Sequence, residues 1–426
     1  MTMARSNLPE ALRDVDTLVL DMDGVVTSEE SYFDAAGLTI RELFESPLYL
    51  GLSQPDYTSI PEVFYRRMAA GARHEWRKYL PSDLIIRCKS RGISTNWDLA
   101  YLVAVLYLAP LFIRSLHSLT SSERPVENNE DPRDWESAEG LAVRSEKLMG
   151  EKEVEEGLGK LAKVYRQAAA RGDWSSALRI ADFMVWGEWL RSRSVKIAPH
   201  KVIDLQLFDD LHPQTRGLDL LSSVHESVHE IGAEFGGLFG RNTALWGDMR
   251  EIFQEWYLGE ELYARESGRP VRAWPKPGLI HKEEPLLGMD RTERVLSTLQ
   301  ESGLRLGIAT GRPRVEIVSP LRRWKFDRHF ETERIATHDE LEKAQRTLRK
   351  YRIDESLSKP HPFVFLRSIH PDETDLNLYK GRYDSHQHRR FAVVGDAVAD
   401  IWAGKKIGCP TVAVLSGVAG VLGRRH

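Results

Sequence analysis

The stretch Thr17-Leu-Val-Leu-Asp-Met-Asp-Gly-Val-Val26 decides the fold. Residues 17–20 form a short apolar run typical of a buried β-strand, and the run ends abruptly in acidic residues and a glycine. A buried strand whose carboxyl end turns into such residues is the usual entry to an α/β active site. The sequence therefore predicts an α/β fold with Asp21 and Asp23 at the tip of its first strand.

Alternating strands and helices return near residue 286. Strands that are separated by helical stretches indicate a doubly wound parallel sheet with helices on both faces. The polar residues that follow these strands can then converge on one edge of the sheet. The expected strands are 306–309, 334–337, 391–394 and 411–415, and residues 294–302 are expected to form a helix.

The middle of the chain has a different pattern of apolar residues. Apolar residues recur there at helical spacing, for example Val154, Leu158, Leu161 and Tyr165, and tryptophans are frequent. We expect one α/β domain formed by residues 1–30 and 286–426, with a large α-helical domain, residues 31–285, inserted after the first strand. A polar, acidic stretch near 119–142 is expected to divide this insertion into two parts.

Composition excludes several classes of protein. The 426 residues carry 59 basic and 63 acidic side chains, so the net charge of −4 argues against a nucleic-acid partner bound through a strong positive field. Cys88 and Cys409 are too few for a disulfide framework and favour a reducing compartment. The apolar run Leu99 to Ile113 is too short for a membrane span. We therefore expect a cytoplasmic protein without a membrane partner; its oligomeric state stays open.

Carboxylates dominate the expected sheet edge. Four of them packed together repel each other strongly unless a cation compensates, and oxygen ligands favour Mg²⁺ over zinc. An ammonium group and a hydroxyl nearby suit an anionic transition state such as a transferring phosphoryl group. The carboxylates are those of Asp21, Asp23, Asp396 and Asp400, and the other two groups belong to Lys359 and Thr310.

Four stretches resemble, in order, the motifs of the haloacid dehalogenase (HAD) superfamily. They are Asp21 to Val26, Thr310 in Ala-Thr-Gly-Arg-Pro, Lys359 in Ser-Lys-Pro-His-Pro, and Gly395 to Asp400. Residues 401–414 and 359–362 are also similar to the phosphoglycolate-phosphatase-like branch. The resemblance covers residues 15–30 and about 286–420 and implies a Rossmann-like core with an inserted helical cap. The insertion is far longer than the usual helical cap of the family.

The resemblance also implies roles for the motif residues. Asp21 would attack phosphorus and become an aspartyl-phosphate, while Asp23 would protonate the leaving oxygen and then activate water. Thr310 would bond a phosphoryl oxygen, and Lys359 would orient the nucleophile and offset charge. The phosphate-binding candidates are Gly24, Thr310, Gly311 and Lys359. Mg²⁺ would be held by Asp21, the backbone carbonyl of Asp23, and Asp396, with the help of Asp400.

The acid at position 23 separates activities within the superfamily. Members that cleave carbon–halogen bonds lack an acid there, and phosphonate cleavage would require a Schiff-base lysine in the cap, which the sequence does not identify. We therefore expect a Mg²⁺-dependent phosphatase for a small phosphorylated metabolite. Candidate contacts to that substrate from the insertion are Trp97, Trp256, His281 and Lys282, although tryptophans at such positions more often pack helices together.

Three other functions stay open at this point. A phosphomutase would use the same core residues. His225-Glu-Ser-Val-His229 matches H-E-x-x-H, in which His225 and His229 could bind zinc with Glu226 as base, as in metalloproteases. The plainer interpretation is a helix of the insertion whose apolar stripe includes Leu221 and Val228. A non-catalytic scaffold that kept the fold is the third alternative.

Overall fold

The computed structural model describes residues 12–46, 49–52, 79–93, 95–117, 243–272 and 275–417, together with 215, 217, 219–221 and 223. The chain divides into two compact units. The first, which we name the α/β unit, contains Met1–Tyr32, Ile86–Thr95 and Leu279–His426. The second, which we name the helical unit, contains Phe33–Ile85 and Asn96–Gly278.

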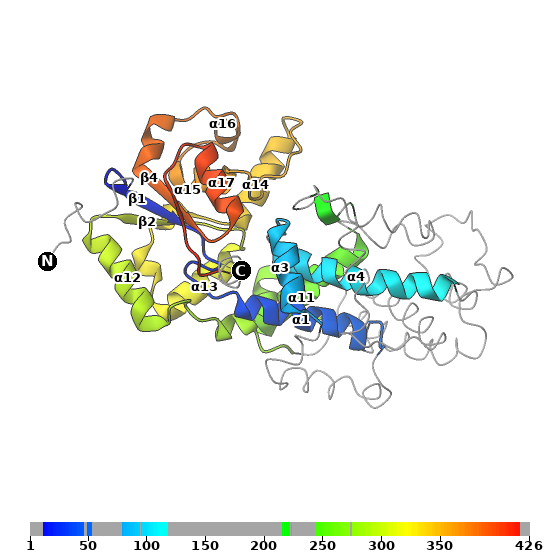
Figure 1. Ribbon diagram of the computed structural model, residues 1–426. Helices are drawn as coiled ribbons and strands as arrows, with labels where there is room; N and C mark the ends of the chain where they lie inside the picture. Colours follow the sequence, from blue (N-terminus) through cyan, green and yellow to red (C-terminus); the bar gives the residue numbers. More distant parts are fainter. Residues whose placement is uncertain are drawn as a thin grey trace. The chain divides into compact units, whose positions relative to one another are not determined.

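A five-stranded parallel sheet forms the centre of the α/β unit (Figure 1), with the strand order β3-β2-β1-β4-β5. In the register of the sheet, Leu20 at the end of β1 lies opposite Ile308 in β2 and Val394 in β4. The residues that follow these three strands therefore meet at one edge. The strands are β1 (Thr17–Leu20), β2 (Arg305–Ala309), β3 (Ile335–Ala336), β4 (Phe391–Gly395) and β5 (Thr411–Ala413).

Helices cover both faces of this sheet. Side chains alternate along β1, so that Leu18 and Leu20 join one buried apolar cluster and Val19 joins another. The first cluster includes Leu296 and Ile317. The second cluster includes apolar residues from the helices that follow β3 and β4 in the chain. The predicted doubly wound parallel sheet is thus confirmed. Its helices are α12 (Met289–Glu301), α13 (Arg314–Trp324), α14 (His338–Arg349), α15 (Phe363–Ile369), α16 (Asp375–Tyr379) and α17 (Val398–Lys406), with short 3-10 turns η7 (Leu279–Lys282), η8 (Asp327–His329), η9 (Thr332–Arg334) and η10 (Ser385–Arg390).

Element boundaries differ from the expected ones by a few residues. The helix expected at 294–302 is α12, which begins five residues earlier, at Met289, directly after Gly288 with its positive φ of 75°. The strand expected at 411–415 ends at Ala413, and the weak strand expected at 334–337 consists of Ile335 and Ala336 alone.

Within its described residues, the helical unit is mostly α-helical. Its described helices are the larger part of α1 (Glu30–Glu45), the start of α3 (Ser82–Ser90), α4 (Asn96–His117) and α11 (Ala244–Ser267). Here α4 packs against α11. None of the described helices is long and apolar enough to cross a membrane. The acidic stretch near 119–142 and the motif of His225, Glu226 and His229 lie outside the described residues.

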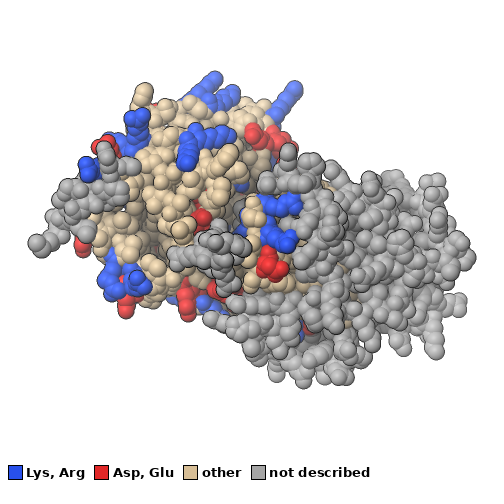
Figure 2. All heavy atoms as spheres, viewed as in Figure 1, with Lys and Arg blue, Asp and Glu red and all other residues tan. Residues whose placement is uncertain are grey.

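On the visible face of the α/β unit, lysines and arginines lie mostly along the margins with fewer aspartates and glutamates among them, and the middle of the face is largely uncharged (Figure 2).

Candidate active site

The tip of β1 forms a tight turn around one carbonyl. The backbone oxygen of Met22 accepts hydrogen bonds from the N–H groups of Val26 and Thr27, at 2.9 and 2.8 Å, and from the Thr27 hydroxyl at 3.0 Å. Asp21 is tied to the neighbouring strand, because its N–H donates to the Val394 carbonyl at 2.8 Å. The turn fixes the backbone on which Asp21 and Asp23 are carried.

Two glycines allow the backbone to approach Asp396. Gly24 has a φ of 68°, and a Cβ placed on it would lie 2.6 Å from Asp396 Oδ2. A Cβ on Gly417, after β5, would lie 1.6 Å from the same oxygen. A side chain at either position would collide with Asp396 as it lies here, and the positive φ of Gly24 also favours glycine. The loops after β1 and β5 therefore pack closely around this carboxylate.

Lys359 connects two of the carboxylates. Its Nζ lies 2.8 Å from Asp21 Oδ1 and 2.8 Å from Asp400 Oδ1. Asp400 is completely buried in the first turn of α17, where its Oδ2 accepts a hydrogen bond from the Ala397 N–H at 3.3 Å. The predicted lysine and two of the predicted acids are therefore brought together by the fold.

Asp21, Asp396 and Asp400 form an oxygen-only cluster. One carboxylate oxygen from each lies within 4.8 Å of the other two. Burial, reinforced by the neighbouring acids, raises the pKa of Asp21 to about 8 despite the opposing charge of Lys359, and raises that of Asp396 to about 7. The ammonium of Lys359 alone does not balance these acids. The cluster has the donors and the excess negative charge that suit a hard divalent cation.

Asp23 belongs to a different set of contacts. Its side chain is not part of the three-carboxylate cluster; instead its Oδ1 accepts a hydrogen bond from Arg312 Nε at 2.9 Å and a second one from Arg312 Nη2. Burial disfavours the charged form of Asp23, but the Arg312 charge and hydrogen bonds outweigh burial and lower its pKa. The aspartate expected to exchange protons is thus held apart from the acids that could bind a cation.

Arg312 was not among the predicted site residues. It follows Thr310 and Gly311 directly after β2, and only 3% of its surface is exposed. The sequence did contain an indication, because an arginine two residues after the expected phosphate-binding threonine must lie close to the site. It needs a buried acidic partner there.

Thr310 and Gly311 lie where the motif places them. Thr310 is 1% exposed, its N–H donates to the Ala336 carbonyl at 3.1 Å, and its Oγ1 accepts from the Arg312 N–H at 3.2 Å. Apart from the adjacent residues, none of the described residues has a heavy atom within 4 Å of a Cβ built on Gly311, so space is open beside this backbone. A threonine hydroxyl beside open backbone suits the binding of an oxyanion.

Lys89 and Glu29 form a second pair that the sequence analysis did not identify. Both belong to the α/β unit, although Lys89 lies within the inserted sequence, at the end of α3. Lys89 Nζ lies 2.9 Å from Glu29 Oε1. The charge of Lys89 lowers the pKa of Asp23 and Asp396, whereas that of Glu29 raises the pKa of Asp396. The charges of this pair therefore change the electrostatic field at the acidic cluster.

The four substrate-contact candidates lie in varied surroundings. Trp256 is 1% exposed, and its Nε1 donates to Glu42 Oε2 at 2.6 Å. Trp97 is also buried and meets Phe253 edge-on at 6.1 Å. Both indoles pack in the interior of the helical unit, the role that tryptophans at such positions more often have. His281 and Lys282 are exposed in η7 of the α/β unit.

Comparison with known proteins supports the motif resemblance. Residues 356–422 match the family model described as HAD-hydrolase-like. The X-ray structure of a Northeast Structural Genomics Consortium target has a similar fold: the TM-score is 0.60 and the identity 24%, over 97% of this chain and 94% of that chain. At this identity the likeness shows the fold alone. A search of the curated proteins found no match. The match confirms, for residues 356–422, the predicted resemblance to the haloacid dehalogenase superfamily, whereas the phosphoglycolate-phosphatase-like branch stays a prediction.

Proposed function

We propose that this protein is a Mg²⁺-dependent phosphatase that hydrolyses a small phosphorylated metabolite through an aspartyl-phosphate. The observation that carries the proposal is the division of the acids into two sets. Asp21, Asp396 and Asp400 form the oxygen cluster with Lys359, while Asp23 stands apart with Arg312. Without a metal ion the pKa of Asp21 is raised by burial and that of Asp23 is lowered by Arg312, so the two roles need a bound cation that keeps Asp21 ionised and an anionic phosphoryl group that favours a proton on Asp23.

The first half-reaction uses both aspartates. An oxygen of Asp21 attacks phosphorus, the bond between phosphorus and the leaving oxygen breaks, and the proton on Asp23 passes to that oxygen. Lys359, 2.8 Å from Asp21, orients the nucleophile and reduces the repulsion between its carboxylate and the anionic phosphoryl group. The hydroxyl of Thr310 donates to a phosphoryl oxygen.

The second half-reaction reverses the role of Asp23. Its carboxylate takes a proton from water, the water oxygen attacks the phosphorus of the aspartyl-phosphate, and the bond to Asp21 breaks. Inorganic phosphate leaves, Asp21 is again a carboxylate, and Asp23 again carries a proton. Atoms and charges balance over the cycle, and no other reactant than water is needed.

Asp21, Asp396 and Asp400 would hold the metal ion, with the backbone carbonyl of Asp23 as a further oxygen donor. When bound, the ion neutralises the phosphoryl oxygens and keeps Asp21 ionised. This second effect matters because burial otherwise raises the pKa of Asp21 to about 8, so that a large share of the nucleophile would be protonated at neutral pH.

Lys89 bears on the phosphonate alternative. Cleavage of a carbon–phosphorus bond through a Schiff base needs a neutral amine. Burial favours the neutral form of Lys89, but the charges of Glu29 and Asp23 outweigh burial and raise its pKa. This lysine is therefore held as a cation and does not favour Schiff-base chemistry.

A screen of phosphorylated metabolites tests the proposal. We expect phosphate release from at least one small phosphomonoester, loss of this activity in EDTA and recovery with Mg²⁺. Release of an isomeric sugar phosphate without free phosphate would indicate the phosphomutase. Recovery with Zn²⁺ alone would favour the metalloprotease, and full biological effect of an Asp21→Asn variant would favour the scaffold.

A further inference from the structure

We infer that Ser416 and Gly417, in the loop after β5, are positioning residues for the metal site: they hold the carboxylate of Asp396 where it meets those of Asp21 and Asp400. The inference rests on the proposed function and deepens it, because it adds residues that orient one of the three expected metal ligands. Neither residue belongs to the four sequence motifs or was among the predicted site residues.

The sheet brings the loop after β5 to Asp396. Strands β4 and β5 are parallel neighbours, with Gly395 at the end of β4 opposite Ala413 at the end of β5. The N–H of Val414 donates to the Gly395 carbonyl at 3.0 Å, so the two chain segments stay paired as they leave the sheet. Asp396 follows Gly395 directly, and residues 414–417 therefore run beside it.

Gly417 is packed against one oxygen of Asp396. Gly417 is buried, and a Cβ built on it would lie 1.6 Å from Asp396 Oδ2 and 2.9 Å from Asp396 Cβ. Non-bonded heavy atoms pack at about 3.5–4.0 Å, so the carboxylate occupies the space in which a side chain of residue 417 would begin. Gly417 does not have a positive φ, so the close contact and not the backbone conformation favours glycine here.

Gly24 contacts the same oxygen from the turn after β1. A Cβ built on Gly24 would lie 2.6 Å from Asp396 Oδ2 and 2.8 Å from the α-carbon of Gly417. The two glycines therefore lie close to each other as well as to the carboxylate. A carboxylate with two backbone segments this close has few other side-chain orientations open to it.

Ser416 joins the two loops. Its Oγ donates a hydrogen bond to the Gly24 carbonyl at 2.6 Å. Gly24 directly follows Asp23, whose backbone carbonyl is an expected metal donor. Ser416 lies at the surface, and one neutral hydrogen bond contributes little to the stability of a whole protein. The effect of this hydrogen bond should therefore be local to the two loops.

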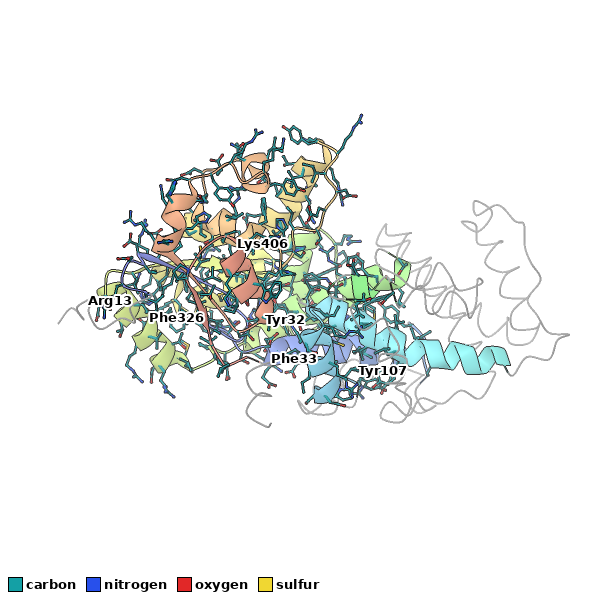
Figure 3. The ribbon with its side chains drawn as sticks, turned by 45° about the horizontal axis from the view of Figure 1, so that its top comes forward. Arg13, Tyr32, Phe33, Tyr107, Phe326 and Lys406 are labelled. Atoms are coloured by element: carbon teal, nitrogen blue, oxygen red, sulfur yellow. The ribbon has the colours of Figure 1, made fainter. Side chains whose placement is uncertain are left out.

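Packing has to orient Asp396, because ionic contacts orient the other two acids. Lys359 Nζ lies 2.8 Å from Asp21 Oδ1 and from Asp400 Oδ1. Asp400 is also fixed by its place in the first turn of α17, whose last residue, Lys406, is labelled in Figure 3. Within the part of the chain that the structure describes, no residue donates a hydrogen bond to the Asp396 side chain or forms an ion pair with it. The two glycines therefore keep an oxygen of Asp396 within 4.8 Å of the other two acids.

Calorimetric titration with Mg²⁺ tests the inference without a measurement of activity. In Gly417→Ala the added methyl group occupies the place of Asp396 Oδ2 and turns the carboxylate away. We expect the affinity for Mg²⁺ to fall about 10- to 100-fold, as is typical when a residue that supports a metal ligand is replaced. The fold should persist, because the end of a short side chain moves more easily than backbone, and thermal unfolding without Mg²⁺ measures this.

A double variant separates positioning from a general loss of structure. Asp396→Asn weakens the ligand itself and should lower the affinity for Mg²⁺ on its own. Gly417→Ala should have no further effect in that background, because both changes act through the same carboxylate.

Ser416 allows one variant that removes its hydrogen bond and one that keeps it. Ser416→Ala should lower the affinity about two- to tenfold, the effect of one hydrogen bond, and Ser416→Thr should restore it because the hydroxyl is retained. Gly247→Ala in α11 is the matched glycine control. Apart from adjacent residues and the backbone of its own helix, no described heavy atom lies within 4 Å of a Cβ built there, so the affinity should equal that of the wild type.

Wild-type affinity in Gly417→Ala or in Ser416→Ala would overturn the inference, and so would a further loss when Gly417→Ala is added to Asp396→Asn. If Gly417→Ala does not fold, the two variants of Ser416 decide. A wild-type protein that binds no Mg²⁺ would contradict both the inference and the proposed function. The proposed function fails alone if the wild-type protein binds Mg²⁺ and the variants behave as expected, but no phosphomonoester releases phosphate.

Discussion

Lys359 Nζ lies at the same distance, 2.8 Å, from Asp21 Oδ1 and from Asp400 Oδ1. One ammonium therefore bridges the residue at the tip of β1 and the first turn of α17. The surplus negative charge of the cluster, with Asp396 as its third member, must be balanced by protons or by a cation.

The nucleophile itself provides the plainest prediction. Asp21→Asn replaces the attacking carboxylate by a weakly nucleophilic amide, so phosphate release should fall to background, while the fold should persist because the change relieves repulsion with Asp400. Phosphate release and thermal unfolding, measured on the same preparation, check this. Full activity in the variant would mean that no aspartyl-phosphate forms at Asp21.

The raised pKa values predict a pH-dependent affinity for Mg²⁺. Burial raises the pKa of Asp21 to about 8 and that of Asp396 to about 7 in the metal-free protein. Between pH 6 and 8 these acids lose protons that otherwise compete with the ion, so affinity should rise with pH and binding should release protons. Calorimetric titration in two buffers of different ionisation enthalpy measures both the affinity and the number of protons released. Binding that is independent of pH would show that these acids are not the ligands.

The pair of Glu29 and Lys89 predicts two effects of opposite sign. Glu29 raises the pKa of Asp396 and Lys89 lowers it, so both charges act on the metal cluster. Glu29→Gln should weaken Mg²⁺ binding and Lys89→Met should strengthen it, each by roughly two- to tenfold for partly screened charges. Calorimetric titration of each variant with Mg²⁺ gives both affinities. Changes of the same sign would show that the variants act through the local structure and not through charge.

The helical unit offers a prediction about stability. Lys276 is fully buried, with Nζ 2.5 Å from Glu255 Oε2 and 2.9 Å from Glu42 Oε2. Lys276→Met leaves two buried carboxylates without this partner and should cost about 3–5 kcal/mol of unfolding free energy. Denaturant titration measures it.

The control for this prediction lies in the same unit. Arg265 pairs with Glu266 at the surface, where its side chain is 64% exposed. Arg265→Ala should change the unfolding free energy by about 1 kcal/mol or less. A similar small loss in Lys276→Met would show that the buried network adds little to stability.

Local chemistry explains why most of the fold and site could be predicted. Each short apolar run followed by an acid, a threonine or a glycine signals a strand end, and parallel strands bring such ends to one edge. Asp21, Thr310 and Asp396 could be placed for this reason. The register of the sheet, with Leu20 opposite Ile308 and Val394, then follows from the need to bury both faces.

Arg312 and Lys89 could not be placed in the same manner. Each acquires its role from an acid that is distant in the chain: Asp23 lies 289 positions from Arg312, and Glu29 lies 60 positions from Lys89. The position of Arg312 directly behind Thr310 indicates that it lies near the site, but no periodicity or local motif indicates which acid either residue pairs with. The division of Asp23 from the other acids depends on Arg312, so it too required the three-dimensional structure.

The strand order has a consequence for synthesis on the ribosome. Thr17 of β1 pairs with Arg305 and Phe391, so the first strand has no partner until most of the polypeptide has been translated. At about 5–20 residues per second, roughly 15 to 60 s pass before β2 emerges. During this interval the apolar strand is exposed and prone to aggregation, which makes the nascent chain a natural client for chaperones.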